Sequence, residues 1–373
     1  MRSGLALGAA LALFALLSGC AAPRTAGITA RPGRGSGVAA LAITRVGVEP
    51  KTITLESGQQ ATIHYELSHP ASVRVDVVDD EGHVVRELEP GTQAVGIQQV
   101  DWDARTASGQ PVPGGVYRYV IRAQDTGGHR AVYDPSGETG GEELQPWKFV
   151  FDRETSSMRW VMPKAGYARL RIGIEGFPHL RTLLDWEPLE AGEHTMVWDG
   201  LDASGLIHLK DHPHLSVKLS VFAMPDNTII VRSSRPGEPP AGPVSYPPAA
   251  KGGSSYLHAR HPRRSCHEVR LHVEFPSAVR SDDTGRPVLS GTVPVRVRLD
   301  AHDARDAINS RFEVALYEDT TFLFEEEDGA DPFTYLWDTA HLPAGAHLLT
   351  VNILTYDDHY GVATQPVMIE EAR

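Results

Sequence analysis

Three copies of one short motif organise this chain. In each copy, a stretch of alternating apolar residues ends at a Trp-Asp pair, and a loop rich in Gly, Pro, Ser or Ala leads into a second alternating stretch. This pattern predicts two antiparallel strands joined by a turn-rich loop. The motif residues are Trp102, Asp103, Gly109, Gly115 and Tyr117 in the first copy, Trp198, Asp199 and Gly205 in the second, and Trp337 and Asp338 in the third.

The three copies predict an all-β chain of three tandem β-sandwich modules. One third of 373 residues is close to the size of a β-sandwich domain of about 100 residues. The 35 Gly and 27 Pro residues and the scarcity of helical patterns favour the same class. We expect modules at residues 43–127, 146–232 and 268–373, joined by a connector at 128–145 and a Pro/Gly-rich linker at 233–267.

Each residue type of the motif suits a structural role. The Trp supplies a large apolar surface for a core, and the Asp can accept hydrogen bonds from loop N–H groups. We expect Gly115 to take the positive φ that returns the chain to the sheet. No base or nucleophile is tied by its spacing to Asp103, Asp199 or Asp338, so we do not expect these residues to be catalytic.

The first copy resembles the immunoglobulin-like domain of the flagellar hook-capping protein FlgD, which also occurs in the sorting regions of secreted bacterial proteins. The residues that carry the resemblance are Tyr65-x-Leu67, Pro70-Ala71-x-Val73, Asp80-x-Gly82, Val85-Arg86-x-Leu88, Trp102-Asp103 and Gly109-x-Pro111-Val112-Pro113-x-Gly115-Val116-Tyr117. The resemblance implies an immunoglobulin-like sandwich for each module, with a diverged second copy and a more generic third copy. Ala104 stands where the family usually has Gly, which loosens the turn chemistry.

The N-terminus resembles the signal peptide of a bacterial lipoprotein. Arg2 precedes an apolar run at residues 5–17, which is too short to cross a bilayer, and the run ends in Leu-Ser-Gly-Cys20. This ending is similar to the lipobox, in which the cysteine thiol receives a diacylglyceryl group. The resemblance implies a signal peptide at residues 1–19 and a lipidated Cys20. An ordinary secretory signal is the alternative.

A lipidated Cys20 implies membrane attachment. Several acyl chains, palmitate among them, hold a protein stably where one chain does not. Ala21 after the cysteine resembles the pattern that sorts lipoproteins to the outer membrane of diderm bacteria, on either its periplasmic or its surface face. Residues 20–42 contain little to bury, and we expect them to form a flexible tether behind the lipid.

Charge and cysteine content limit the partners and the covalent chemistry. The formal charge of −13 disfavours non-specific binding to nucleic acid, and we expect no nucleic-acid partner. Lipidation of Cys20 leaves Cys266 as the remaining thiol, so each module has to be held by its own core without an intramolecular disulfide.

A His–Cys cluster lies just before the third module and offers a metal or redox site. It comprises His258, His261, Cys266 and His267. Imidazole and thiolate together suit zinc or copper. Arg263 and Arg264 inside the cluster oppose a bound cation, so a solvated or partly packed linker end is the alternative.

Two further groups interrupt the repeats. His208, His212 and His214 stand where the second copy loses the family's hairpin, either as ligands or as a solvated loop tip. The acidic run at residues 325–331 and the Asp-Asp-His at 357–359 offer oxygen ligands for calcium, or simply exposed turns.

No hydrolase, phosphate-binding or dinucleotide motif occurs, so we expect a non-enzymatic protein without a cofactor. Its expected role is that of a membrane-anchored spacer or binding module for an envelope protein or a polysaccharide. One alternative is a metal-binding or redox lipoprotein that uses the His–Cys cluster. The other is an accessory module of an envelope hydrolase that binds polysaccharide through exposed Trp147, Trp160 or Trp186.

Overall fold

The structure, a computed structural model, describes residues 40–80, 82–176, 179–232, 268–278, 280–356 and 359–371. Strands dominate these residues, and α2 (Ala301–Ser310) is the α-helix among them. The all-β prediction is therefore confirmed. The predicted signal peptide, Cys20 and the linker at 233–267 lie outside the described residues.

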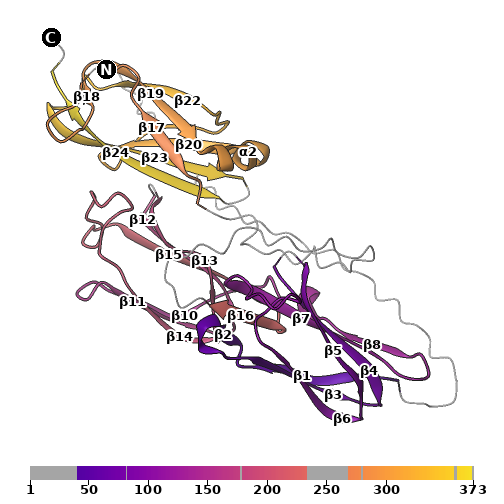
Figure 1. Ribbon diagram of the computed structural model, residues 1–373. Coiled ribbons are helices and arrows are strands. Elements are labelled where there is room, and N and C mark those ends of the chain that lie inside the picture. Colours follow the sequence, from indigo (N-terminus) through magenta and orange to yellow (C-terminus); the bar gives the residue numbers. More distant parts are fainter. Residues whose placement is uncertain are drawn as a thin grey trace, which may run out of the picture. The chain divides into compact units, whose positions relative to one another are not determined.

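The first sandwich contains two sheets (Figure 1). Its strands are β1 (Ile43–Glu49), β2 (Thr52–Thr54), β3 (Ala61–Leu67), β4 (Ala71–Val78), β5 (Val84–Gln93), β6 (Gly96–Trp102), β7 (Gly115–Gln124), β8 (Arg130–Tyr133) and β16 (Thr228–Arg232). One sheet has the order β1-β3-β6, and the other has the order β2-β16-β7-β4-β5, with β8 beside β7. Alternate residues of β3 and β4 are buried in the core between the sheets, as the period of two in their sequences predicts.

A strand from far along the chain completes this first sandwich. β16 runs parallel to β2 and antiparallel to β7, and it brings Ile229 and Val231 into the first core. The sequence boundary at 146–232 groups β16 with the second module, whereas its hydrogen bonds join it to the first. A short apolar run such as Thr228–Arg232 is consistent with a buried strand, but it does not show which sheet the strand enters.

The second sandwich follows in the chain. Its strands are β9 (Glu143–Leu144), β10 (Trp147–Asp152), β11 (Ser157–Met162), β12 (Gly166–Ile174), β13 (His179–Leu189), β14 (Gly192–Val197) and β15 (Leu215–Ala223). They form the sheets β10-β11-β14 and β13-β12-β15-β9. β8 and β9 lie inside the stretch expected as a connector at 128–145; β9 is the edge strand beside β15, and β8 pairs with the C-terminal part of β7.

The first two sandwiches share a second, smaller core. Val116 and Ile230 of the first sandwich cluster with Tyr167, Trp186 and Met224 of the second. All residues of β12 are buried: Tyr167 lies in this shared core, and the guanidinium groups of Arg169 and Arg171 lie over the ring of Tyr360. The same core buries Val116 near the start of strand β7.

The third sandwich lies at residues 268–371 (Figure 1). Its strands are β17 (Leu271–Glu274), β18 (Val288–Leu289), β19 (Thr292–Leu299), β20 (Phe312–Glu318), β21 (Thr321–Glu326), β22 (Phe333–Asp338), β23 (Gly345–Thr355) and β24 (Tyr360–Ile369). The sheets β17-β19-β22 and β18-β24-β23-β20-β21 enclose one core. Helix α2 was not expected, because its sequence has too few large apolar residues to show a helical period.

Candidate functional site at the Trp-Asp loops

The indole rings of the motif are buried, and their N–H groups are paired. Trp102, Trp198 and Trp337 are 0%, 2% and 0% exposed. In the first two copies the indole N–H donates to the backbone carbonyl oxygen three residues later, at 3.1 and 2.9 Å. In the third copy it donates to the carboxylate of Glu318 at 2.8 Å. Each Trp therefore fixes its loop as well as filling the core.

Each Asp of the motif closes the turn that follows it. Oδ1 of Asp103, Asp199 and Asp338 accepts a hydrogen bond from the backbone N–H two residues later, at 3.2, 3.0 and 3.1 Å. This is the local bond that Asp forms in turns. Asp199 and Asp338 are exposed, and Asp103 is half-buried. The geometry gives these carboxylates a structural role.

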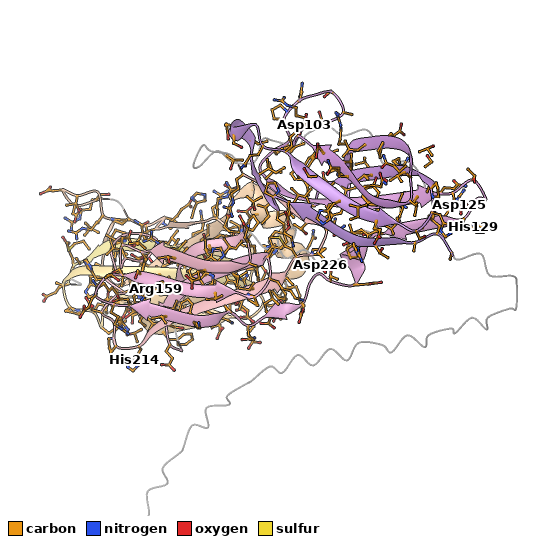
Figure 2. The ribbon with its side chains drawn as sticks, turned by 90° about the horizontal axis from the view of Figure 1, so that it is seen from below. Asp103, Asp125, His129, Arg159, His214 and Asp226 are labelled. Carbon is orange, nitrogen blue, oxygen red and sulfur yellow. The ribbon has the colours of Figure 1, made fainter. Side chains whose placement is uncertain are left out.

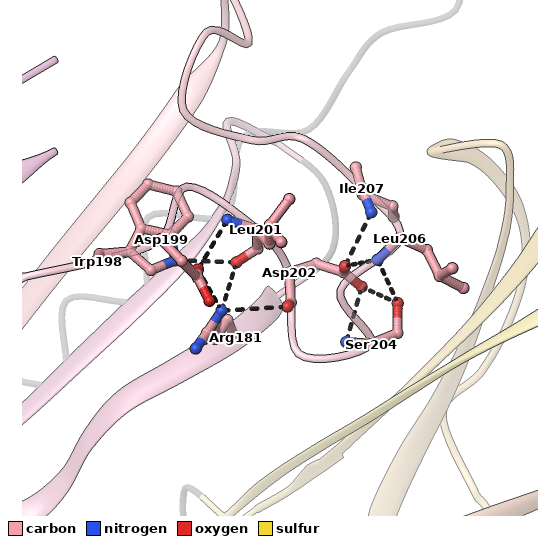
Figure 3. A network of polar contacts seen from close by, with 8 residues as sticks. All are labelled: Arg181, Trp198, Asp199, Leu201, Asp202, Ser204, Leu206 and Ile207. Atoms are coloured by element: carbon pink, nitrogen blue, oxygen red, sulfur yellow. Dashed lines mark hydrogen bonds and ion pairs between the residues drawn. The ribbon is translucent and has the colours of Figure 1, made fainter. Parts of the chain in front are cut away.

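The second copy adds an ion pair to this turn (Figure 3). Nη1 of Arg181 lies 2.7 Å from Oδ1 of Asp199 and also donates to the carbonyl oxygen of Leu201 at 3.0 Å. The backbone N–H of Leu201, followed by the guanidinium of Arg181, lowers the pKa of Asp199. β13 supplies Arg181, so this contact attaches the loop to the sheet.

Asp202 organises the same loop from inside (Figure 3). It is 1% exposed. Its carboxylate accepts hydrogen bonds from the hydroxyl of Ser204 at 2.6 Å and from the backbone N–H groups of Leu206 and Ile207, both at 2.9 Å. The repeated motif predicts roles for Asp199 and Gly205 but not for Asp202, which is the more buried and the more fully bonded carboxylate.

Asp202 belongs to a turn that the chain uses repeatedly. In this turn Oδ1 of an Asp accepts the backbone N–H four residues later at 2.9 Å. A Gly at the third position after the Asp has a φ between 74° and 84° and donates its N–H to the Asp carbonyl oxygen. The sequence signal that would have revealed it is Asp-x-x-Gly. The pairs are Asp79 and Gly82, Asp125 and Gly128, Asp202 and Gly205, and Asp282 and Gly285.

These turns occupy different parts of the fold. Figure 2 shows Asp103 of the first Trp-Asp pair well apart from Asp125 and His129, which lie together at one end of the first sandwich. Asp103 and Asp125 therefore do not share one site. Among the described residues, no three His, Cys, Asp or Glu side chains are grouped so that they could hold a metal ion.

Comparison with known proteins identifies the first sandwich. Residues 51–127 match the family model of the FlgD Ig-like domain. They form an immunoglobulin-like domain of the FlgD type. The resemblance predicted from the first Trp-Asp copy is confirmed for these residues. Immunoglobulin-like domains of this type indicate a structural or binding module and are typically non-catalytic.

The curated relatives match a short part of the chain. The basal-body rod modification protein FlgD of Salmonella typhimurium is 38% identical over 71 residues, which cover 19% of this chain and 30% of the relative. FlgD of Salmonella typhi gives the same values. The chain thus spans less than a third of the length of these relatives.

Two solved structures resemble the chain with low TM-scores. The crystal structure of FlgD from P. aeruginosa is 26% identical, covers 25% of this chain and 67% of that chain, and has a TM-score of 0.20. The fibronectin(III)-like modules of Clostridium thermocellum CbhA are 11% identical, cover 88% of this chain and 95% of that chain, and have the same TM-score.

Glycine placement in the FlgD-type domain differs from expectation. Gly109 takes the positive φ, at 80°, and closes the loop. Gly115 is not in the positive-φ region, because it is already part of strand β7 and pairs with Val231. The expected role of Gly115 is therefore wrong. Ala104, at the position where the family usually has Gly, does have a positive φ of 54°.

The histidine loop of the second sandwich does not form a ligand cluster. His208 is exposed, and His212 accepts the backbone N–H of His214 through Nδ1 at 3.2 Å. The rings of His212 and His214 are 6.1 Å apart. His214 lies at the periphery of the molecule (Figure 2). Leu209, buried between these residues in the sequence, anchors the loop to the second core.

Only some of the other predicted site residues lie among the described residues. Trp160 and Trp186 are 3% and 1% exposed, so neither offers a face to a sugar ring. The side chain of Trp147 lies outside the described residues, as do the cluster of His258, His261, Cys266 and His267, the lipidation site Cys20, and Asp357 and Asp358.

The acidic run of the third sandwich does not converge on a cation site. Asp328 forms an ion pair with Arg311 at 3.2 Å. Asp331 accepts the backbone N–H of Leu299 at 3.0 Å. These carboxylates therefore serve the ends of neighbouring elements. Within the described ranges, no helix is long and apolar enough to cross a membrane.

Proposed function

We propose that this chain is a lipid-anchored envelope protein that acts as a non-enzymatic spacer and binding module. Cys20 provides the acyl chains that hold it in the outer membrane of a diderm bacterium. The tether at residues 20–42 reaches about 75 Å when fully extended. The sandwiches then present their surfaces to an envelope protein, and the charge of −13 keeps nucleic acid away.

Open sheet edges are the observation that supports binding. The strand before each Trp-Asp pair is an edge strand: in the described part of the chain, β6, β14 and β22 each have one hydrogen-bonded neighbour. The large apolar residues Ile97, Val197 and Leu336 lie on these strands and are 71%, 73% and 65% exposed. Unpaired backbone groups beside exposed apolar side chains can accept a further strand.

The opposite edge of the first sheet is protected. β1 is bulged between Thr44 and Gly47, and Arg45 has a positive φ of 49°. A bulge of this kind twists an edge away from pairing. β6 contains neither a bulge nor a Lys, Arg or Pro residue. The asymmetry indicates that β6 is the edge that is left open for a partner.

An extended protein segment fits these edges better than a polysaccharide does. Main-chain hydrogen bonds along an edge recognise another backbone. Polysaccharide sites ordinarily present aromatic faces, but Trp160 and Trp186 are buried. We therefore place an envelope protein ahead of a polysaccharide as the partner.

Fractionation of cells tests the anchor. A full-length Cys20→Ala chain should move from the membrane fraction to the soluble fraction, whereas the matched Cys266→Ala chain should stay in the membrane fraction. Retention of the Cys20→Ala chain in the membrane would remove the lipid anchor from the proposal.

Site-specific photocrosslinking in cells tests the open edges. A photoreactive residue at Ile97, Val197 or Leu336 should give an adduct with a specific envelope protein. The control position is Ile308 on helix α2, which is 53% exposed but lies on no sheet edge. If the edge positions crosslink no more strongly than Ile308, the binding role of the edges is wrong.

A further inference from the structure

The loop after the first Trp-Asp pair is closed by a tyrosine. The hydroxyl of Tyr117 donates to the carbonyl oxygen of Pro113 at 2.7 Å. Its ring lies 5.2 Å from that of Trp102. A tyrosine hydroxyl ordinarily keeps its proton at neutral pH, so this closure does not depend on pH in that range.

In the third copy a histidine takes the place of this tyrosine. The chain reads Gly-Ala-His347 where the first copy reads Gly-Val-Tyr117. Nε2 of His347 lies 2.9 Å from the carbonyl oxygen of Pro343, with the same four-residue spacing. Nδ1 of His347 lies 2.6 Å from Oδ2 of Asp319. The histidine thus makes the tyrosine's contact and adds a second one.

Both partners of His347 are hydrogen-bond acceptors. A carbonyl oxygen and an ionised carboxylate can only accept, so both ring nitrogens have to donate, and this is possible only for the imidazolium form. The side chain of His347 is 9% exposed, so its ring has little contact with water, whereas the carboxylate of Asp319 is 45% exposed. A neutral imidazole has one N–H, and its formation would leave one of the two contacts without a proton.

Two consecutive carboxylates hold the whole loop. Oδ1 of Asp319 accepts the backbone N–H of Leu348 at 2.8 Å. Glu318 receives the indole N–H of Trp337 at 2.8 Å on one oxygen and Nε2 of His341 at 2.9 Å on the other. The carboxylates at the end of β20 therefore bind both ends of the third Trp-Asp loop, at Trp337 and at Leu348.

We propose that His347 and Asp319 form a proton-dependent lock on the third Trp-Asp loop. The lock is closed while the imidazole of His347 is protonated, and loss of that proton releases the loop from the end of β20. This inference concerns the third sandwich alone and does not rest on the proposed anchoring or partner.

The charges that face the lock favour its closed form. Glu318 and Asp319 lie at the turn between β20 and β21, and Asp338 and His341 lie in the loop itself. On the neighbouring strand β24, the residue paired with His347 is the uncharged Val367. Three carboxylates surrounding the two histidines stabilise the imidazolium form.

The pKa values of the two histidines follow from this setting. Burial opposes the charge on His347, but the hydrogen bonds to Asp319 and to the Pro343 carbonyl outweigh it and raise the pKa. The hydrogen bond to Glu318 raises the pKa of His341. Because both pKa values are raised by folding, the stabilisation is complete below the unfolded value of about 6.5. It is lost as the pH rises through the folded values.

Nuclear magnetic resonance of the whole chain, labelled at histidine, tests the lock. The imidazole resonance of His347, assigned by its absence in a His347→Gln chain, should titrate with a midpoint above about 6.5. Hydrogen exchange of the Leu348 amide, corrected for its intrinsic pH dependence, should accelerate through the same midpoint. A midpoint at or below this reference value would overturn the proposal.

The Asp319→Asn substitution separates the effect of the carboxylate charge from that of the hydrogen bond to Leu348. The amide oxygen can still accept the Leu348 N–H, but the charge is gone, so the midpoint of His347 should fall by about one pH unit. The matched control is Asp283→Asn, an exposed aspartate of another loop, which should leave the midpoint unchanged. An unchanged midpoint in Asp319→Asn would also overturn the proposal.

Discussion

Ile230 of β16 lies in register with Val116 of β7 on one side and with Thr52 of β2 on the other. The family match of the FlgD-type domain ends at residue 127, yet the sheet of this domain includes residues 228–232. The chain thus returns after the second sandwich to add a strand to the first, and the FlgD-type domain depends on sequence far outside its own match.

Truncation of Ile230 should destabilise the FlgD-type domain. Ile230 is 1% exposed, and Ile230→Ala should cost about 2–5 kcal/mol because it leaves a cavity in a packed cluster. Loss of hydrogen-exchange protection along β7 is the measurement. The control is Val132→Ala on β8, which is 56% exposed and should change the stability by less than about 0.5 kcal/mol. Equal protection of β7 in the two chains would contradict the role of β16.

Asp202 should matter more to stability than the motif residue Asp199. Asp202→Ala removes the buried carboxylate that accepts the N–H groups of Leu206 and Ile207, at about 1–3 kcal/mol, whereas Asp199→Ala removes an exposed turn contact worth about 1 kcal/mol. Denaturant unfolding followed by Trp fluorescence measures both. Asp211→Ala, an exposed change in the same loop, is the control. A larger loss from Asp199→Ala would reverse this ranking.

Two glycines of the first loop should respond differently to alanine. Gly109 has a φ of 80°, so Gly109→Ala forces a side chain into the left-handed region and should cost about 1–2 kcal/mol. Gly115 is in strand β7, and an added Cβ would meet no atom within 4 Å. Gly115→Ala should therefore be neutral or stabilise by up to about 1 kcal/mol. Thermal unfolding of the two chains distinguishes the outcomes, and equal losses would refute the assignment.

Two buried tyrosines should resist ionisation at high pH. Burial raises the pKa of Tyr65 to about 12 and raises that of Tyr119 further, and neither hydroxyl has a hydrogen-bond partner among the described residues. The unfolded chain releases these protons near pH 10, as free tyrosine does, and the folded chain does not. Stability should therefore fall as the pH rises above about 10.

Ultraviolet absorbance of tyrosinate measures this delay. Tyr65→Phe should remove part of the late-titrating signal without loss of stability, because its hydroxyl has no partner to lose. Complete ionisation of all tyrosines while the chain remains folded would show that these two rings are not buried.

The sequence was most informative where a pattern is local. The alternation around Trp102 predicts strands that the structure contains at β6 and β7, because a period of two follows directly from the pleat. Long-range pairing left no such signal: β16 is a short apolar run buried on both faces, and only its neighbours reveal its sheet. Helix α2 was not predicted because its sequence shows no helical period of apolar residues: Ala307 is its one buried apolar residue.

The candidate sites show the same limit. The three Trp-Asp pairs were found because they repeat, and their turn-closing bonds lie within two residues. Asp202 was missed because its role depends on burial, which spacing does not report. The contact of His347 with Asp319 joins positions on different elements, so the sequence showed only that a histidine had replaced a tyrosine.

Strand β16 also determines when the first sandwich can complete its folding during synthesis. Synthesis runs from the N-terminus, so β7 is made long before residues 228–232, and its edge stays unfilled until the entire second sandwich has been made. A chain that stops early carries an open apolar edge, which is the state that promotes aggregation. Synthesis of β16, which ends at Arg232, thus converts the FlgD-type domain from an aggregation-prone intermediate into a complete sandwich.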